Sequence, residues 1–187
     1  MQSTFRTVID ESYLSDPANS VRWEKTIEFI RRSSVSATVI DKGLDLGDRT
    51  PFTASLEELF GCEFENTTAD LDLASLVGSF GVVTAFEVRE HLYNPLHALL
   101  EVKHLLNGDS ARAYVSMPLR KPLFLASPGH FHEMSRQSAL SLFTRAGFSI
   151  VRSEEFRIRP LLFYLTGFKP LLRAVFEKVQ IYELTAQ

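Results

Sequence analysis

The most strongly patterned stretch of the chain lies near its middle, where an apolar run gives way to charged residues and then to helical spacing. Residues 82–86 are mostly apolar and begin with β-branched residues, which predicts a strand buried on both faces. Residues 87–91 are mostly ionisable, and leucines then recur at helical spacing over 96–106. Asn94 and Pro95 suit the cap and the first position of that helix. Because open α/β sheets bind ligands beyond the carboxyl ends of their strands, this stretch predicts a functional site.

Strands and helices are expected in alternation on both sides of this stretch. The other predicted strands cover residues 38–46, 62–68, 111–117, 148–158 and 179–184, and the other predicted helices cover residues 21–32, 52–60 and 135–146. The segment 160–177 is apolar with a helical tendency, and 179–184 alternates as an edge strand does. This order predicts an α/β fold with a mainly parallel sheet.

Composition narrows the possible classes of protein. A chain of 187 residues suits one domain, with an arm and helix over 1–36 and an α/β core over 37–187. A net charge of -3 provides no basic face for nucleic acid. Cys62 is the only cysteine, so no internal disulfide forms, and residues 1–20 lack the apolar core of a signal peptide. The longest apolar run, 161–165, is far below the roughly 20 residues that span a bilayer. A cytoplasmic protein without an integral membrane segment is expected.

Four short motifs occur in a recognisable order. Leu-Asp-Leu-Gly stands at 44–47, Phe-Glu-Val-Arg-Glu-His-Leu at 86–92, Tyr-Val-Ser-Met-Pro at 114–118 and Ala-Gly-Phe at 146–148. Over roughly residues 21–157 the chain resembles class I S-adenosylmethionine (SAM)-dependent methyltransferases, and the second motif is close to their Glu-His-Leu signature. The resemblance implies a Rossmann-like α/β fold with a twisted, mainly parallel, seven-stranded sheet, helices on both faces and an antiparallel C-terminal strand.

The resemblance also implies a cofactor and a reaction. The cofactor is SAM, and the expected activity is methyl transfer to a small-molecule acceptor. The residues implied for the cofactor are Asp45, Gly47 and Asp48 at its methionine end, Asp70 and Leu71 at its ribose or adenine, and Phe86 and Glu87 beside its sulfonium. Acidic and aromatic groups suit this cation, and the in-line transfer needs positioning more than covalent help.

Candidate catalytic groups follow the central strand. His91 is the candidate base, because imidazole titrates near neutral pH and can take a proton from an oxygen nucleophile. The alternative role is a histidine that fixes the loop at a helix start. Glu90 is the second candidate, and its alternative is a structural partner of a backbone amide or of Arg89. Two histidines and one acid in the run 130–133 fall short of a ligand set, so we expect a cap or substrate lid there and no metal site.

Several residues depart from the methyltransferase pattern and favour a second reading. Arg49 and Pro51 stand at later glycine places, Thr68 stands near the place of the ribose-binding acid, and Gly81 stands where Asp is common. Asp70 is the substitute expected for Thr68. The second reading is a non-catalytic protein that keeps this fold, has lost the cofactor and acts as a binding module. A nicotinamide-binding Rossmann domain is disfavoured because its glycine fingerprint is absent.

Three other segments carry alternatives. The short interval 62–81 suggests that a helix and a strand of larger relatives are missing or reduced. Tyr13, Arg22 and Trp23 either close over the cofactor or pack a first helix against the sheet. The apolar segment 160–177 is expected to pack against the sheet, with a lipid-like substrate, a membrane surface or a partner subunit as alternatives. A homodimer therefore stays open.

Overall fold

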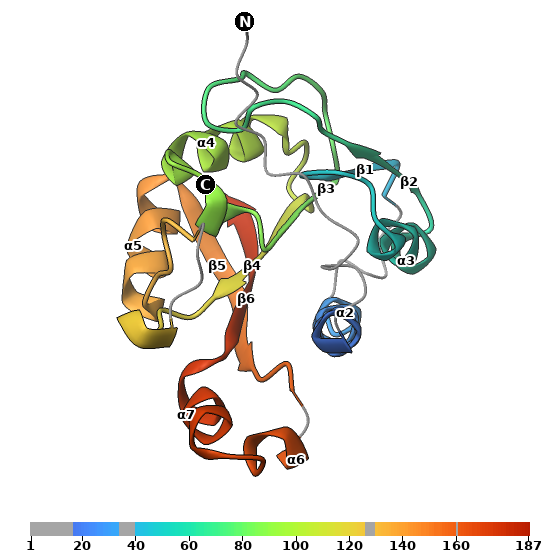
Figure 1. Cartoon of the computed structure of the whole chain (residues 1–187). Coiled ribbons are helices and arrows are strands. Elements are labelled where there is room, and N and C mark those ends of the chain that lie inside the picture. Colours follow the sequence, from blue (N-terminus) through green and yellow to red (C-terminus); the bar gives the residue numbers. More distant parts are fainter. Residues whose placement is uncertain (1–16, 34–39, 126–129, 160) are drawn as a thin grey trace, which may run out of the picture.

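The computed structural model describes residues 17–33, 40–125, 130–159 and 161–187. A six-stranded sheet in the order β2-β1-β3-β4-β6-β5 forms the centre of the molecule (Figure 1). The strands are β1 (Lys42–Asp45), β2 (Glu63–Asn66), β3 (Val82–Phe86), β4 (Arg112–Pro118), β5 (Phe148–Phe156) and β6 (Val179–Ala186). The helices are α2 (Pro17–Arg31), α3 (Pro51–Phe60), η2 (Arg89–His91), α4 (Pro95–Leu105), η3 (Leu123–Leu125), α5 (Arg136–Arg145), α6 (Leu161–Tyr164) and α7 (Phe168–Phe176).

The direction of the strands confirms the predicted fold class. β2, β1, β3 and β4 are mutually parallel, and the C-terminal strand β6 runs antiparallel to both of its neighbours. Asp45 at the end of β1 is in register with Asn66 of β2 and Thr84 of β3. The sheet of the described chain has six strands and not seven, because residues 67–79 form neither helix nor strand. The short interval between β2 and β3 had predicted this reduction.

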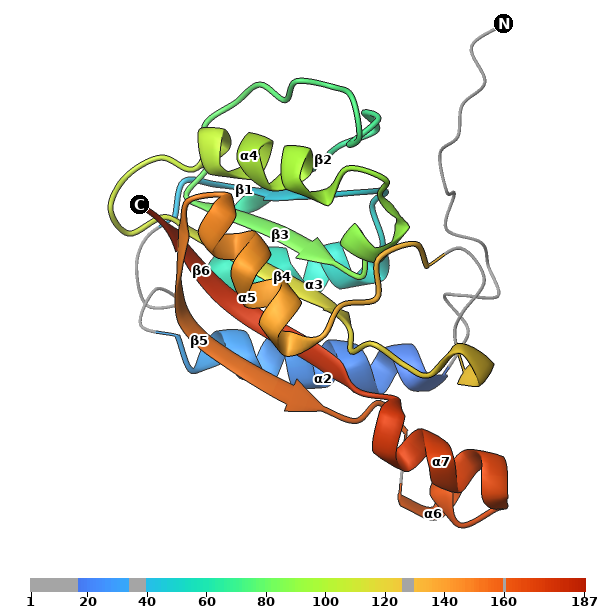
Figure 2. The same ribbon diagram turned by 90° about the vertical axis from the view of Figure 1, so that its left-hand side faces the viewer.

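Helices cover both faces of the sheet (Figure 1). Adjacent residues of a strand point to opposite faces, and β3 shows this directly. Val83 joins the core under α4 and α5, whereas Val82 joins the core under α2 and α3. Figure 2 shows α4 and α5 on one side of the sheet and α2 and α3 behind it. This double covering explains why the central strand is apolar apart from Thr84.

Short-range signals in the sequence set the helix ends. The side chain of Thr50 accepts a hydrogen bond at the start of α3, and Gly61 ends that helix in the left-handed conformation, with φ +66. Asn94 caps α4 ahead of Pro95, and the hydroxyl of Ser135 caps α5. The predicted cap at Asn94 and helix start at Pro95 are confirmed.

The prediction that residues 179–184 form an edge strand is wrong. β6 lies between β4 and β5, and all six of these residues are buried. The polar residues that suggested an exposed edge have partners inside the protein. Gln180 donates to the carbonyl of Met134 over 2.8 Å, and Glu183 accepts from Arg152 over 2.7 Å. The edge strand at this side of the sheet is β5.

The segment after β5 also differs from its prediction. α6 and α7 form a helical hairpin that extends beyond the sheet (Figure 2), and of its described apolar side chains Tyr164 is buried whereas others are exposed, so the segment does not pack against the sheet as a whole as expected. Its exposed apolar side chains are Leu162, Leu165, Phe168, Leu171 and Val175. Among the helices that the structure describes, none combines the length and the hydrophobicity needed to cross a membrane.

Candidate functional site

The end of β1 carries a buried carboxylate, Asp45, that is fully engaged inside the protein. One of its oxygens accepts from the hydroxyl of Thr84 over 2.7 Å, and the other accepts from the hydroxyl of Thr53 over 2.8 Å. Burial raises the pKa of Asp45 to about 6, although these hydrogen bonds oppose the shift. Asp45 therefore ties the end of β1 to β3 and to the first turn of α3.

Asp45 also marks the point where the order of the strands reverses. The chain passes from β1 to β2 on one side, while β3 lies on the other side, and open α/β sheets bind ligands at such a switch point. Gly47 follows with φ +110, and no atom lies within 4 Å of the position that a Cβ would occupy. The predicted residues Asp45, Gly47 and Asp48 thus lie together at the switch point.

Asn66 is a site residue that the sequence reasoning missed. It is the last residue of β2, and its amide donates to the carbonyls of Asp45 and Gly47 over 3.3 Å each. Asp70 lies four residues further on, exposed, and its carboxylate accepts from a backbone N–H of its own turn over 3.0 Å. Asn66 therefore occupies the strand end for which Thr68 and Asp70 were considered. The alternation of charged and apolar residues over 63–65 ends at Asn66, and this could have indicated Asn66 as the end of the strand.

The aromatic residue at the end of β3 faces the α2–α3 side of the sheet. Phe86 packs edge-on against Phe52 with ring centroids 5.4 Å apart, and Phe52 stacks on Trp23 over 5.5 Å. Trp23 thus packs its helix against the core, which is the plainer of its two predicted roles. Leu71 packs against the opposite core, under α4 and α5. Tyr13 lies outside the described residues.

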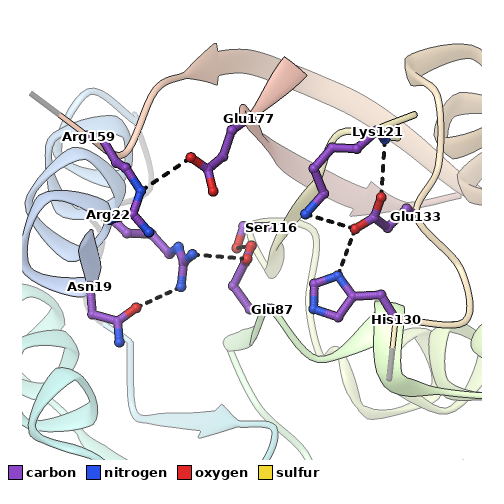
Figure 3. A network of polar contacts seen from close by, with 9 residues as sticks. All are labelled: Asn19, Arg22, Glu87, Ser116, Lys121, His130, Glu133, Arg159 and Glu177. Carbon is purple, nitrogen blue, oxygen red and sulfur yellow. Dashed lines mark hydrogen bonds and ion pairs between the residues drawn. The ribbon is translucent and has the colours of Figure 1, made fainter. Parts of the chain in front are cut away.

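Glu87 follows β3 in a backbone conformation that is rare outside glycine, with φ 55. Such residues cost on the order of 1–3 kcal/mol and cluster at functional sites. Its carboxylate accepts from the hydroxyl of Ser116 over 3.0 Å and forms an ion pair with Arg22 of α2 over 3.6 Å (Figure 3). Arg22 also donates to Asn19 over 2.8 Å. The start of α2 is thereby connected to the end of β3.

Arg49, which stands at a glycine place of the methyltransferase pattern, is directed along α3. It donates to the carboxylate of Glu57 over 3.0 Å and to the carbonyl of Phe64 over 3.4 Å. Its side chain is 53% exposed. This orientation agrees with the open space beside Gly47, so Arg49 does not fill that space.

A cavity of about 190 Å³ opens beyond the end of β3. Glu87, Glu90 and His91 line it together with His130, whose ring contacts that of His91. The start of α2 and the junction of α7 with β6 contribute further walls. A larger hollow of about 570 Å³ is lined by residues of α2 and α3 alone, away from the strand ends. The smaller cavity is therefore the one that the predicted catalytic residues line.

The carboxylate of Glu90 is buried without a hydrogen bond in the part of the chain that the structure describes. The expected pairing with Arg89 is not formed. The guanidinium of Arg89 lies over the ring of Phe143 at 5.1 Å and contacts the sulfur of Met117. Burial, and then the nearby charge of Glu87, raise the pKa of Glu90 well above its ordinary value.

The histidines of the site separate into two groups. The rings of His91 and His130 meet edge to face with centroids 4.9 Å apart. Nδ1 of His130 is 2.9 Å from the carboxylate of Glu133, which also contacts Nζ of Lys121 over 3.0 Å (Figure 3). Nε2 of His132 instead lies 3.3 Å from the carbonyl of Tyr93. The run 130–133 is therefore not one cluster.

Comparison with known proteins supports the fold. No family model matches the chain, and no curated protein matches it. One similar solved structure is the O-methyltransferase of a trans-AT PKS multienzyme of Brevibacillus brevis in complex with S-adenosyl-L-homocysteine (SAH), with 12% identity over 91% of this chain and 76% of that one and a TM-score of 0.63. The N-methyltransferase NodS of Bradyrhizobium japonicum WM9 is 12% identical over 92% of this chain and 98% of its own, with a TM-score of 0.59.

A further similar structure is described as a [4+2]-cyclase, SpnF, with 13% identity over 87% of this chain and 81% of its own and a TM-score of 0.56. At these identities the likeness concerns the fold alone. The chain has the class I methyltransferase fold, as the sequence motifs had indicated. Because one of these neighbours is named for a different reaction, the fold by itself does not determine the activity, which depends on the site.

Proposed function

We propose that this chain transfers the methyl group of SAM to a small-molecule acceptor. The observation that carries the proposal is the switch point, where Asp45 joins β1 to β3 and Gly47 faces open space. SAM would lie across the ends of β1, β2 and β3. Its proposed contacts are Asp45, Gly47 and Asp48 at the methionine end, Asp70 and Leu71 at the ribose or adenine, and Phe86 and Glu87 beside the sulfonium.

The acceptor would occupy the cavity beyond β3. At about 190 Å³ this cavity is smaller than the roughly 300–1,000 Å³ of typical ligand pockets, so it suits a small acceptor and not the whole cofactor. Glu87 belongs both to the end of β3 and to the cavity wall, which would bring the acceptor next to the sulfonium. Glu90 and His91 are the groups proposed to act on the acceptor, with His91 as base for a hydroxyl.

The second candidate is a non-catalytic binding module with the same fold. Both carboxylate oxygens of Asp45 are used within the protein, and residues 67–79 form no helix or strand beside β2. Pro51, Thr68 and Gly81 remain departures from the cofactor-binding pattern. On this reading the strand ends hold the fold together and bind no SAM.

Calorimetric titration with SAH separates the two candidates. Micromolar binding supports the enzyme, whereas neither heat nor a thermal shift at millimolar SAH supports the binding module. Gly47→Ala then locates the site, because the added methyl group projects into the open space and we expect affinity to fall at least tenfold.

Gly108→Ala is the matched control for Gly47→Ala. Gly108 also has a positive φ, +92, and open space around it, but it precedes β4 at the opposite end of the sheet. Both variants carry a similar backbone strain, so only the loss specific to Gly47 reports the cofactor site. Equal affinities of the two variants would contradict the proposed placement.

His91→Ala tests the acceptor side of the site. We expect the affinity for SAH to be unchanged. With any acceptor found by screening small hydroxyl and amine compounds, SAH should form from SAM at least a hundredfold more slowly. Normal turnover would remove His91 from the reaction.

A further inference from the structure

Among the described residues, the carboxylate of one acid of the cavity beyond β3, Glu90, forms no hydrogen bond with another residue and no ion pair, although the charges of Arg22 and Arg89 act on it from a distance. Three basic side chains of its wall are each held by an acid, in the pairs Arg22–Glu87 at 3.6 Å, Lys121–Glu133 at 3.0 Å and Arg159–Glu177 at 3.3 Å (Figure 3). Glu90 is 1% exposed, and among the described residues neither of its carboxylate oxygens has a hydrogen-bond partner. A buried carboxylate is costly unless it is neutralised or paired, so this position calls for a proton or a cation.

Two imidazoles lie beside this carboxylate. One ligand atom each from Glu90, His91 and His130 falls within 4.8 Å of the others. Bonds of about 2.0–2.2 Å to a tetrahedral ion place ligand atoms roughly 3–3.5 Å apart, so modest side-chain rotations close the set. One carboxylate with two imidazoles is a donor set typical of Zn²⁺ and Fe²⁺, whereas Mg²⁺ and Ca²⁺ prefer oxygen alone.

The backbone holds the two ligand-bearing segments together. Glu90 and His91 are consecutive residues of the short helix η2. The carbonyl of Glu90 accepts from the backbone N–H of Phe131 over 2.7 Å and from that of His132 over 3.3 Å. These bonds hold the loop that carries His130 against η2, so side chains from two distant parts of the chain lie next to one another.

A neighbouring carboxylate orients the third ligand. Nδ1 of His130 is 2.9 Å from Glu133, which leaves Nε2 as the ligand atom. Metal-binding histidines are commonly held in this way by a carboxylate. Lys121 contacts the same carboxylate through its Nζ and its backbone N–H, which fixes Glu133 in turn.

We propose that Glu90, His91 and His130 bind one divalent transition-metal ion of the Zn²⁺ type, with its remaining coordination position open to the cavity. This set differs from the run 130–133, in which the sequence analysis expected no metal site. If the proposed function holds, the ion would bind an acceptor hydroxyl and lower its pKa, so that the proton passes to solvent water at the open side of the cavity, and His91 would then be a ligand and not the base.

Direct metal binding to the full chain tests the proposal. Chelator-treated protein is titrated with Co²⁺, followed by its visible absorption, and with Zn²⁺ by calorimetry. We expect one ion per chain at micromolar affinity or tighter. Glu90→Gln and His130→Ala should each weaken binding at least a hundredfold, and Glu133→Gln, a positioning residue, by 10–100-fold with the stoichiometry retained.

His132→Ala is the matched control, because His132 lies two residues from His130 and contacts Tyr93 instead. Its affinity for Co²⁺ should change less than twofold. Thermal unfolding without metal verifies that each variant is folded, and His130→Gln replaces His130→Ala if the smaller side chain prevents folding. Absence of Co²⁺ absorption at millimolar ion, or equal losses in the His130 and His132 variants, would overturn the site.

Two further observations make the result specific. A large excess of Mg²⁺ should leave the Co²⁺ spectrum unchanged, and displacement by Mg²⁺ would overturn the class of ion. The metal titration measures binding in the cavity, whereas the SAH titration measures binding at the end of β1. Binding of Co²⁺ without binding of SAH would therefore support the metal site and contradict the proposed methyl transfer.

Discussion

Two buried carboxylates near the strand ends, Asp45 and Glu90, have opposite surroundings. Their exposed fractions are 7% and 1%, and burial raises the pKa of both. Asp45 accepts a hydroxyl hydrogen bond at each oxygen, whereas Glu90 has no hydrogen bond among the described residues. The first carboxylate is part of the frame of the sheet. The second is buried without such a partner among the described residues, which is the reason for the proposed metal site.

The two carboxylates also differ in how they are positioned. Asp45 is the last residue of a strand, and the register of β3 and the first turn of α3 bring Thr84 and Thr53 to it. Glu90 lies in the short helix η2, and its backbone carbonyl accepts hydrogen bonds from the backbone of the loop that carries His130. Replacing each acid should therefore remove the ligand proposed for its region but have opposite effects on stability.

Asp45→Ala should have the largest effect on stability. It leaves the buried hydroxyls of Thr53 and Thr84 without their acceptor, at about 1–3 kcal/mol each, so the free energy of unfolding should fall by about 4 kcal/mol. Urea unfolding measures the loss, and SAH binding should disappear with it. The exposed Asp109→Ala serves as control with little change, and a loss below about 1 kcal/mol at Asp45 would contradict its structural role.

The raised pKa of Asp45 predicts the next largest effect. The folded protein holds this proton up to a pKa of about 6, against an ordinary value of 3.8, so the ionised group contributes less stability than the neutral one. This contribution is present below pH 4 and is lost as the pH rises to about 6, by roughly 3 kcal/mol. The free energy of unfolding is measured at pH 4 and pH 7 for wild type and for Asp45→Asn. Only wild type should lose this stability between the two pH values, because asparagine does not titrate. Parallel pH profiles would contradict it.

Glu90→Met should act in the opposite direction to Asp45→Ala. Replacing a buried carboxyl group that has no partner by an apolar side chain of similar size should raise the free energy of unfolding of the metal-free protein by about 1 kcal/mol. Urea unfolding with chelator present measures this gain. A loss as large as that of Asp45→Ala would mean that Glu90 also belongs to the frame.

Arg49→Ala should have the smallest effect and tests whether the first region is open. Because its guanidinium is held by Glu57 and Phe64, the substitution should leave SAH affinity within twofold of wild type. A marked increase in affinity would show that Arg49 obstructs the cofactor.

Much of the local structure could be predicted because its causes lie within a few residues. The span of β3 was predicted to the residue, and Asn94 caps the helix that it was expected to cap. The wall of Glu87, Glu90 and His91 could also be anticipated, since residues just after a buried parallel strand must lie at its carboxyl edge.

The partners of the site residues could not be predicted, because strand register and loop packing select them. Asn66 reaches the end of β1 only through the pairing of β2 with β1. The separation of His130 from His132 depends on Glu133 and on the bonds of that loop to η2.

The sequence by itself determined the alternation of elements, the ends of α3, α4 and α5 and the position of the charged strand end, because each depends on local spacing and capping. The first helix begins at Pro17, four residues before its predicted start. Only the tertiary structure decided that β6 is an interior strand and that the α6–α7 hairpin stays exposed. It also decided that Asp45 is satisfied and Glu90 is not. The physical reason is that polarity along a chain does not report burial. A polar residue such as Glu183 is stable inside when a distant residue, here Arg152, supplies its partner.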